Sequence, residues 1–364
     1  MKPEQDWWVF PGFELKLIAK GLDLPVNIAI THNKSNVLLY VTELYGQVRA
    51  ITKDYKVYTY AQELLNYKPV PEIPGKGESG VTGICIEPQS GDLLVSMLYE
   101  DKKEIKGKLV RMKSKDGLKV DSMDTIIDDI PSTTKAHQIQ APSIGFDGKL
   151  YLNVADGGSW EKSPQDDNDL RGKILRMNLD GSIPTDNPVK GNLVFSKGFR
   201  NPFGAAWRKS DKSLYVTING PAVDDVLAKV EAGSNHGWYG DMRTNALFWW
   251  HFTQAPTALD FMQDGQFHSR FSDELFVALF GDSYQKGRQV KGKKIVKMRI
   301  NKTATGISSY DEFVTYTGKG AASPCGLAFG DEGLYFSDLH GGNIYLVRPR
   351  EDYDFDKEME HVFP

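Results

Sequence analysis

The 364-residue sequence has little cysteine, no long apolar run and no surplus of basic residues. Two cysteines, Cys85 and Cys325, are too few for a disulfide framework, and both lie in apolar runs that favour buried free thiols. No stretch approaches the roughly 18 consecutive apolar residues of a transmembrane helix. The net charge of −4 provides no basic surface for nucleic acid. These absences argue against a disulfide-stapled scaffold, a membrane span and a nucleic-acid partner.

The first eight residues, Met1 to Trp8, lack the apolar core of a signal peptide. Two interpretations stay open at this point. Either the protein is cytoplasmic, or a leader was removed and Met1 was added for expression.

A short strand pattern recurs six times along the chain. In each copy a turn residue precedes an aliphatic or aromatic run, and a polar residue or glycine follows it. The six copies are 38–42, 92–96, 149–153, 213–217, 274–278 and 333–337. Their spacing is roughly 55–65 residues, somewhat longer than usual propeller repeats, so we expect extra length in loops.

Two further strands accompany many of these copies. A following strand combines glycine with alternating apolar and basic residues, at 46–51, 107–112, 172–177 and 342–347. A preceding strand is visible at 26–30, 83–86 and 325–329. Such alternation places one face of each strand in a core and the other outward.

Six strand units with almost no amphipathic helix predict an all-β fold, a six-bladed β-propeller of four-stranded antiparallel blades. The prediction covers residues 1–364 as one domain, with a short N-terminal extension over about residues 1–11. A β-sandwich or a solenoid is the alternative. A sandwich of this length is unusual, and solenoid repeats are normally shorter.

The region 135–241 carries the densest set of short motifs. In order, they are Ala136-His137-Gln138, 145–151 (Gly-Phe-Asp-Gly-Lys-Leu-Tyr), 172–176 (Gly-Lys-Ile-Leu-Arg), 180–188 (Asp-Gly-Ser-Ile-Pro-Thr-Asp-Asn-Pro), 198–204 (Gly-Phe-Arg-Asn-Pro-Phe-Gly), Gly220-Pro221 with Asp224-Asp225, and 235–238 (Asn-His-Gly-Trp). This ordered set resembles the glucose/sorbosone dehydrogenase family, which contains PQQ-dependent aldose dehydrogenases and has a six-bladed propeller fold.

The resemblance implies an oxidoreductase that depends on PQQ and Ca²⁺ and transfers hydride from an aldose sugar or related polyol to PQQ. It implies that His137 is the general base, and a histidine has a suitable pKa for that task. It implies a calcium ion at the backbone carbonyls of Gly220 and Pro221, oxygen ligands of the kind that calcium prefers.

The resemblance also implies the remaining cofactor-binding residues. They are Glu78, Gln138, Asn201, Lys286 and Arg288. It further implies a small-molecule sugar substrate, an external electron acceptor and a periplasmic or secreted location. We expect the segments 113–140 and 237–273 to be loops that roof the site and select the substrate.

Several residues depart from the pattern of the resembled family. The family's sugar oxidisers carry an aspartate before the base and an arginine four residues after it, whereas this chain has Ala136 and Ala141. They also use arginines near the start of the last repeat, where this chain has Ser323 and Cys325. Because charge-assisted arginine pairs are a natural way to hold the carboxylates of PQQ, these differences weaken the prediction of cofactor binding.

Two alternatives to the dehydrogenase therefore stay open. One is a non-catalytic propeller that binds a ligand or partner and has lost tight PQQ binding. The other is a calcium-dependent lactone hydrolase, which would require several carboxylates converging on the metal.

Overall fold

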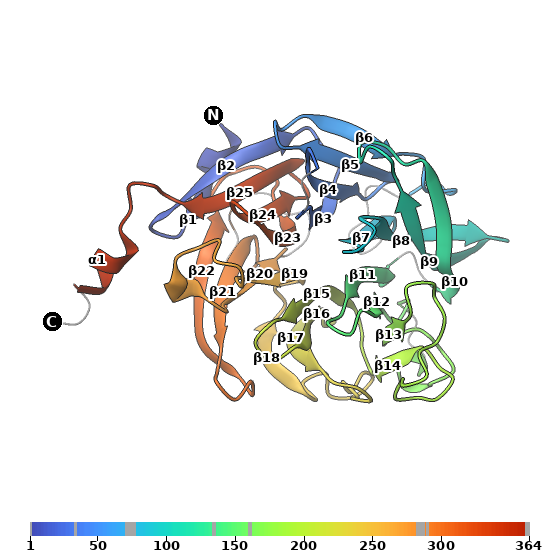
Figure 1. Cartoon of the computed structure of the whole chain (residues 1–364). Helices are drawn as coiled ribbons and strands as arrows, with labels where there is room; N and C mark the ends of the chain where they lie inside the picture. The colour runs from blue at the N-terminus through green and yellow to red at the C-terminus, as the bar shows by residue number, and fades with distance from the viewer. Residues whose placement is uncertain are drawn as a thin grey trace.

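The computed structural model describes residues 2–32, 35–69, 78–132, 136–158, 162–281, 288 and 291–360, with side chains up to residue 357. Within these ranges six antiparallel sheets succeed one another around a ring, each radiating from a common centre (Figure 1). The predicted all-β six-bladed propeller is confirmed.

The first three blades are each built from four consecutive strands. Blade 1 contains β3 (Pro25–Ile30), β4 (Val37–Glu43), β5 (Gln47–Thr52) and β6 (Val57–Ala61). Blade 2 contains β7 (Val81–Ile86), β8 (Leu93–Asp101), β9 (Glu104–Lys113) and β10 (Ser122–Pro131). Blade 3 contains β11 (Ile139–Ile144), β12 (Leu150–Val154), β13 (Lys173–Met177) and β14 (Val194–Lys197).

The fourth blade is likewise built from four consecutive strands, whereas the fifth and sixth each include a strand from the N-terminal part of the chain. Blade 4 contains β15 (Pro202–Arg208), β16 (Ser213–Ile218), β17 (Val223–Val230) and β18 (Ala246–Phe252). Blade 5 contains β19 (Pro256–Phe261), β20 (Leu275–Leu279), β21 (Lys294–Ile300), β22 (Ile307–Tyr316) and β1 (Trp7–Val9). Blade 6 contains β23 (Pro324–Gly330), β24 (Gly333–Asp338), β25 (Asn343–Pro349) and β2 (Phe13–Lys20).

Helical segments are short in the described part of the chain. They are three 3₁₀ turns, Pro3–Asp6, Ser163–Gln165 and Ser269–Phe271, and the helix α1 (Phe355–Glu360). Among the described residues, no helix is both long and apolar enough to cross a bilayer.

The second strand of each blade is largely buried, which explains its continuous apolar sequence. All five residues of β12 and of β20 are buried, because each strand is covered by a neighbouring blade on both faces. The outer strand β10 is mostly exposed and correspondingly polar. All six copies of the repeated pattern correspond to second strands, so that prediction is confirmed.

Buried hydroxyl groups link the blades near the centre of the ring. Thr42 Oγ1 of blade 1 donates to the carbonyl oxygen of Thr82 in blade 2 at 3.0 Å. Ser337 Oγ of blade 6 donates to the carbonyl oxygen of Val26 in blade 1 at 2.7 Å, which joins the last blade to the first. These bonds satisfy inner-strand carbonyls that would otherwise be buried without a partner.

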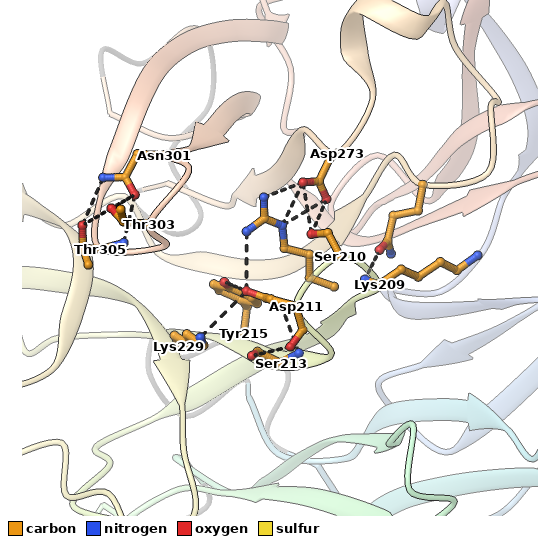
Figure 2. Close-up of polar contacts among 12 residues, drawn as sticks. Lys209, Ser210, Asp211, Ser213, Tyr215, Lys229, Asp273, Asn301, Thr303 and Thr305 are labelled. Atoms are coloured by element: carbon orange, nitrogen blue, oxygen red, sulfur yellow. Dashed lines mark hydrogen bonds and ion pairs between the residues drawn. The ribbon is translucent and has the colours of Figure 1, made fainter.

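A salt bridge links blades 4 and 5 at the other end of the inner strands. Figure 2 shows Asp273, in the turn before β20, beside Ser210, which follows β15. Arg208 at the end of β15 donates from Nε to both carboxylate oxygens of Asp273 at 3.0 and 3.1 Å. The Tyr215 hydroxyl donates to Asp211 at 2.7 Å beside this pair. The blades are thus fixed to each other on both sides of the ring.

Two expectations from the sequence need correction. The segments 113–140 and 237–273, expected as roofing loops, contain β10, β18 and β19, so much of their length forms blades. The segment expected as an N-terminal extension contributes β1, which pairs with β22 and gives blade 5 a fifth strand.

Candidate active site

A cavity of about 320 Å³ lies at the mouth of the central channel where the innermost strands begin. Residues from all six blades line it. Those used below are Glu78, His137, Arg200, Asn201, Asn219, Gly220 and Pro221 on one side, and Val26, Leu44, Phe280, Cys325 and Leu339 on the other. His137 and the Gly220-Pro221 turn, which are far apart in the sequence, therefore face one space.

His137 lies two residues before β11 and pairs with Asp156, which follows β12. The distance from His137 Nδ1 to Asp156 Oδ1 is 2.7 Å. If Nδ1 carries the proton that this carboxylate accepts, Nε2 is left as the unprotonated nitrogen. The arrangement can therefore remove a proton from a group in the cavity and stabilise the resulting imidazolium.

Asp156 is itself held by several donors. Trp238 Nε1 donates to its Oδ2 at 2.8 Å, and the Gly158 N–H donates to its Oδ1 at 2.9 Å. The backbone N–H of Asp156 donates to the carbonyl oxygen of Arg200 at 2.8 Å. A nearly buried carboxylate with these fixed donors gives the His137 ring a defined orientation.

Arg200 and Asn201 lie immediately before β15 and project charge and amide groups into the cavity. Arg200 Nη1 donates to the carbonyl oxygens of Asn219 and Gly220 at 2.9 and 2.8 Å. Burial lowers the pKa of the Arg200 guanidinium, with Asp156 and Glu78 opposing that shift. An arginine nevertheless stays protonated in proteins, so the cavity contains a permanent positive charge.

Glu78 is an acceptor in this network. Its Oε2 accepts from the backbone N–H of His137 at 3.3 Å and, more weakly, from Asn201 Nδ2 at 3.5 Å. The Oδ1 atom of Asn201 is buried, and no donor in the described part of the chain reaches it. The same is true of Asn219 Oδ1. Two amide oxygens next to the cavity are therefore available to a ligand.

Asp225 in β17 holds the Gly220-Pro221 turn in place. Asp225 Oδ1 accepts from the Gly220 N–H at 2.8 Å. Its Oδ2 accepts from Thr253 Oγ1 at 3.1 Å and from the N–H groups of Gln254 and Ala255 at 2.6 and 2.8 Å. Burial raises the pKa of this carboxyl, although these four donors oppose the shift.

The opposite wall of the cavity is apolar. Val26, Leu44, Cys325 and Leu339 form a buried cluster against which Phe280 packs. Burial raises the pKa of the Cys325 thiol to about 12, so it is neutral at physiological pH. The cavity thus has a polar side around His137 and an apolar side around Cys325.

Two of the predicted cofactor residues, Gln138 and Arg288, do not contribute side chains to the cavity, and a third lies outside the described residues. The Gln138 amide is occupied, since Oε1 accepts from the Gly80 N–H at 3.1 Å and Nε2 donates to Thr82 Oγ1 at 2.9 Å. Arg288 is exposed and does not line the cavity. Lys286 lies outside the described residues.

The sequence model of the Glucose / Sorbosone dehydrogenase family matches residues 22–303, most of the chain. This chain is a member of the Glucose / Sorbosone dehydrogenase family.

Two curated proteins that are similar to this Glucose / Sorbosone dehydrogenase chain are named after an activity. Quinoprotein glucose dehydrogenase B of Acinetobacter calcoaceticus is 27% identical over 241 residues, covering 57% of this chain and 50% of that protein. Aldose sugar dehydrogenase YliI of Escherichia coli (strain K12) is 24% identical over 281 residues, covering 66% of this chain and 75% of that protein. The match thus spans half the length of the first relative and three quarters of the second.

Solved structures share the fold of this family member. A glucose dehydrogenase superposes with a TM-score of 0.77 over 93% of this chain and 99% of the other, at 18% identity. The PQQ-bound form of aldose sugar dehydrogenase from Streptomyces coelicolor superposes with a TM-score of 0.69 over 94% of this chain and all of the other, at 21% identity. These likenesses establish the propeller architecture.

Two residues beside the cavity, Asp156 and Arg200, were not predicted as site residues from the sequence. Asp156 follows the repeated strand of blade 3 in an Asp-Gly-Gly turn, and Arg200 precedes Asn201 in the Arg-Asn-Pro motif. Arg200 belongs to the 198–204 motif, one of those on which the family resemblance rests. Their position at strand ends facing the channel was the available signal.

A larger cavity of about 630 Å³ occupies the other mouth of the channel, where the inner strands end. Asp260 lines it, and burial raises the pKa of that carboxyl to about 6. Of the site residues predicted from the family resemblance, none that the structure describes lines this cavity.

His236, in the motif shared with the family, makes fold stability sensitive to acid. It stacks on Phe199, and burial lowers the pKa of His236 to about 4. Between pH 6.5 and 4 the unfolded chain binds a proton on this ring that the folded chain does not, so stability decreases as pH falls. We expect the loss to total roughly 3 kcal/mol.

Urea unfolding of the wild type and of His236→Phe across pH 4–8 tests this. The difference between their free energies of unfolding is expected to be constant above pH 7. Below pH 6 the wild type is expected to lose stability relative to the variant. A difference that does not change with pH contradicts the assignment.

Proposed function

We propose that this family member is a PQQ- and Ca²⁺-dependent oxidoreductase that oxidises an aldose sugar or related polyol by hydride transfer to PQQ, with His137 as general base. The observation that carries the proposal is the His137–Asp156 pair in one cavity with Arg200, Asn201 and the Gly220-Pro221 turn. The names of the curated relatives support the same class of reaction.

The oxygen atoms of the cavity suit a calcium ion. The Gly220 carbonyl and the side-chain oxygen of Asn219 are neutral hard ligands, and the latter has no donor in the described part of the chain. Arg200 shares the Gly220 carbonyl, which has a second lone pair for a cation. We assign Gly220 and Pro221 to the metal.

The polar wall also suits an anionic cofactor. Arg200 is the one arginine or lysine among the described residues that line the cavity, and a guanidinium pairs strongly with carboxylates. We assign Asn201 and Glu78 to the polar contacts of PQQ, and the assignment of Lys286, Gln138 and Arg288 stays a prediction. When bound, PQQ supplies a quinone carbonyl that receives hydride, and calcium supplies a Lewis acid that polarises it.

The chain's own residues perform the proton transfer. His137 Nε2 accepts the proton of the substrate hydroxyl as hydride leaves the same carbon, so the C–OH becomes C=O and two electrons leave the sugar. The Asp156 carboxylate stabilises the imidazolium. An external electron acceptor completes the proposed cycle, and the proposal places the enzyme in the periplasm or outside the cell.

Dye reduction by the purified protein with a panel of aldoses tests the proposal. We expect activity only when PQQ and Ca²⁺ are both added, and no activity with either alone. No dye reduction with any sugar, together with no calcium-dependent quenching of protein fluorescence by PQQ, contradicts it.

The apolar wall favours a second candidate, a non-catalytic propeller that binds a ligand or partner. Cys325 lies where the family resemblance places an arginine, and Val26, Leu44, Phe280 and Leu339 surround it. The lactone hydrolase alternative lacks such support, since the described residues contain no cluster of three His, Cys, Asp or Glu side chains suited to a metal.

A further inference from the structure

The cavity at the other mouth of the channel has no part in the proposed oxidation. Its volume is about 630 Å³, and the innermost strands of all six blades, β3, β7, β11, β15, β19 and β23, contribute to its lining (Figure 1). We call it the distal cavity. Its size falls within the roughly 300–1,000 Å³ of small-molecule sites, so it can enclose a ligand.

One position of the innermost strands forms a ring around the distal cavity. In each blade it is the residue that pairs with the third position of the repeated strand pattern, and all six members line the cavity. They are Ala29, Cys85, Ser143, Ala206, Asp260 and Ala328. Five of these residues are small and uncharged. The ring therefore presents a single carboxylate, that of blade 5, to an otherwise uncharged circle.

The propeller does not need a carboxylate at this position to close. Asp260 Oδ1 accepts from the N–H of Phe261, and Oδ2 accepts from the N–H of Phe329 in blade 6, both at 2.8 Å. The other five blades have alanine, cysteine or serine at the same position and still pack against their neighbours. The requirements of the fold therefore do not explain why blade 5 has an aspartate.

The Asp260 carboxylate lacks a strongly cationic neighbour. No lysine or arginine of the described chain lines the distal cavity or forms an ion pair with Asp260. Burial raises the pKa of this carboxyl to about 6, although the two N–H donors and, less strongly, His32 oppose the shift. At pH 8 the group is therefore ionised and partly desolvated. Each oxygen keeps a lone pair for a further donor, which favours a cationic ligand.

Apolar side chains provide much of the remaining lining. They include Ile30, Ile86, Ile144, Leu259 and Leu327. Trp207 also lines the cavity, and its Nε1 donates to Ser143 Oγ at 3.2 Å, which fixes the indole ring. A divalent metal ion requires several oxygen ligands, whereas this ring offers one carboxylate. A cation with an apolar body matches the lining better, because an indole face also attracts positive charge.

We propose that the distal cavity binds a small organic primary amine in its protonated form. The ammonium group donates to Asp260, and the apolar body of the amine packs against Trp207 and the isoleucine side chains. This inference goes beyond the proposed oxidation and does not depend on it, because the two cavities lie at opposite mouths of the channel and binding is measured without cofactor.

Calorimetric titration of the purified protein at pH 8 tests the proposal with three compounds. Phenethylamine, 2-phenylethanol and 3-phenylpropionate share a phenyl body and differ in charge. Phenethylamine is expected to bind at least tenfold more tightly than the other two, the size typical of one hydrogen bond to a charged group. No measurable binding of phenethylamine, or equal affinity for the amine and the alcohol, overturns the proposal.

Asp260→Asn locates the binding site. This variant is expected to lose at least tenfold in affinity for phenethylamine and to bind 2-phenylethanol within threefold of the wild type. Asp338→Asn is a matched control, because Asp338 also accepts two backbone N–H bonds, from Ser323 and Gly341 at 2.7 and 3.1 Å. Burial raises the pKa of its carboxyl to about 6 as well, and it does not line the distal cavity. An amine affinity that persists in Asp260→Asn, or falls equally in Asp338→Asn, contradicts the assignment.

A pH series on the wild type does not depend on the stability of either variant. Phenethylamine stays protonated between pH 8 and 5, since an aliphatic ammonium has a pKa of about 10. Asp260 takes up a proton near pH 6, so the preference for the amine over the alcohol is expected to decrease as pH falls. His32 and Asp264 are the charged side chains that act on Asp260, and His32 also gains charge in this range. The decrease is expected to remain in His32→Gln, and a preference that is the same at pH 8 and 5 overturns the proposal.

Discussion

Replacing His137 by alanine is expected to lower kcat of the PQQ- and calcium-loaded protein by about 10²–10⁴-fold, the usual contribution of a general base. Nδ1 of this ring is engaged by Asp156 at 2.7 Å, and no other histidine lines the cavity within the described residues. The imidazole is mostly enclosed, with 16% of its side chain exposed. Stopped-flow or steady-state dye reduction at saturating sugar measures the change.

Two further variants make the result interpretable. His32→Ala removes an exposed histidine near the other channel mouth and is expected to leave kcat unchanged. Asp156→Asn keeps the size of the side chain that orients the base, and is expected to lower kcat while KM changes little. If His137→Ala retains kcat within threefold of the wild type, His137 is not the base and the binding-propeller interpretation gains support.

Replacing Asp225 by alanine is expected to lower the free energy of unfolding by about 3–5 kcal/mol. This carboxylate is fully buried and accepts hydrogen bonds from Gly220, Thr253, Gln254 and Ala255. The substitution leaves three backbone N–H groups without their acceptor, and breaking a buried charged network has a cost of this size. Urea denaturation at pH 7 measures it.

The same variant is expected to weaken calcium binding, because Asp225 fixes the turn that we assign to the metal. Asp264→Ala removes an exposed aspartate in the connection between β19 and β20 and is expected to change stability by less than about 0.5 kcal/mol. A loss below about 1 kcal/mol in Asp225→Ala would show that water replaces the carboxylate and that the turn does not depend on it.

Most of the fold could be predicted from local sequence patterns. The second strands were predictable because they are buried on both faces and read as continuous apolar runs, as in Leu150–Val154. The strand β10 was missed, since Ser122–Pro131 lies at the exposed edge of blade 2 and alternates weakly. The pairings of β1 with β22 and of β2 with β25 join residues about 300 positions apart, which no local pattern reports.

The candidate site was predictable only where a family motif indicated it. His137 and Gly220-Pro221 carry recognisable motifs, and the structure places them around one cavity. The role of Asp156 depends on its contact with the imidazole ring of His137, 19 residues earlier. The role of Arg200 depends on its hydrogen bonds to the carbonyl oxygens of Asn219 and Gly220, 19 and 20 residues later. Such roles arise from the approach of neighbouring strand ends, which appears only when the chain has folded.

The pairing of β2 with β25 has a consequence for how the protein is made. Phe13–Lys20 is synthesised well before its hydrogen-bonding partner, Asn343–Pro349, because the two strands are far apart along the chain. During translation this early strand has an unpaired edge that other chains can bind. Closure of the ring is a long-range contact, which slows folding, so co-translational yield should depend on how well chaperones shield this one segment.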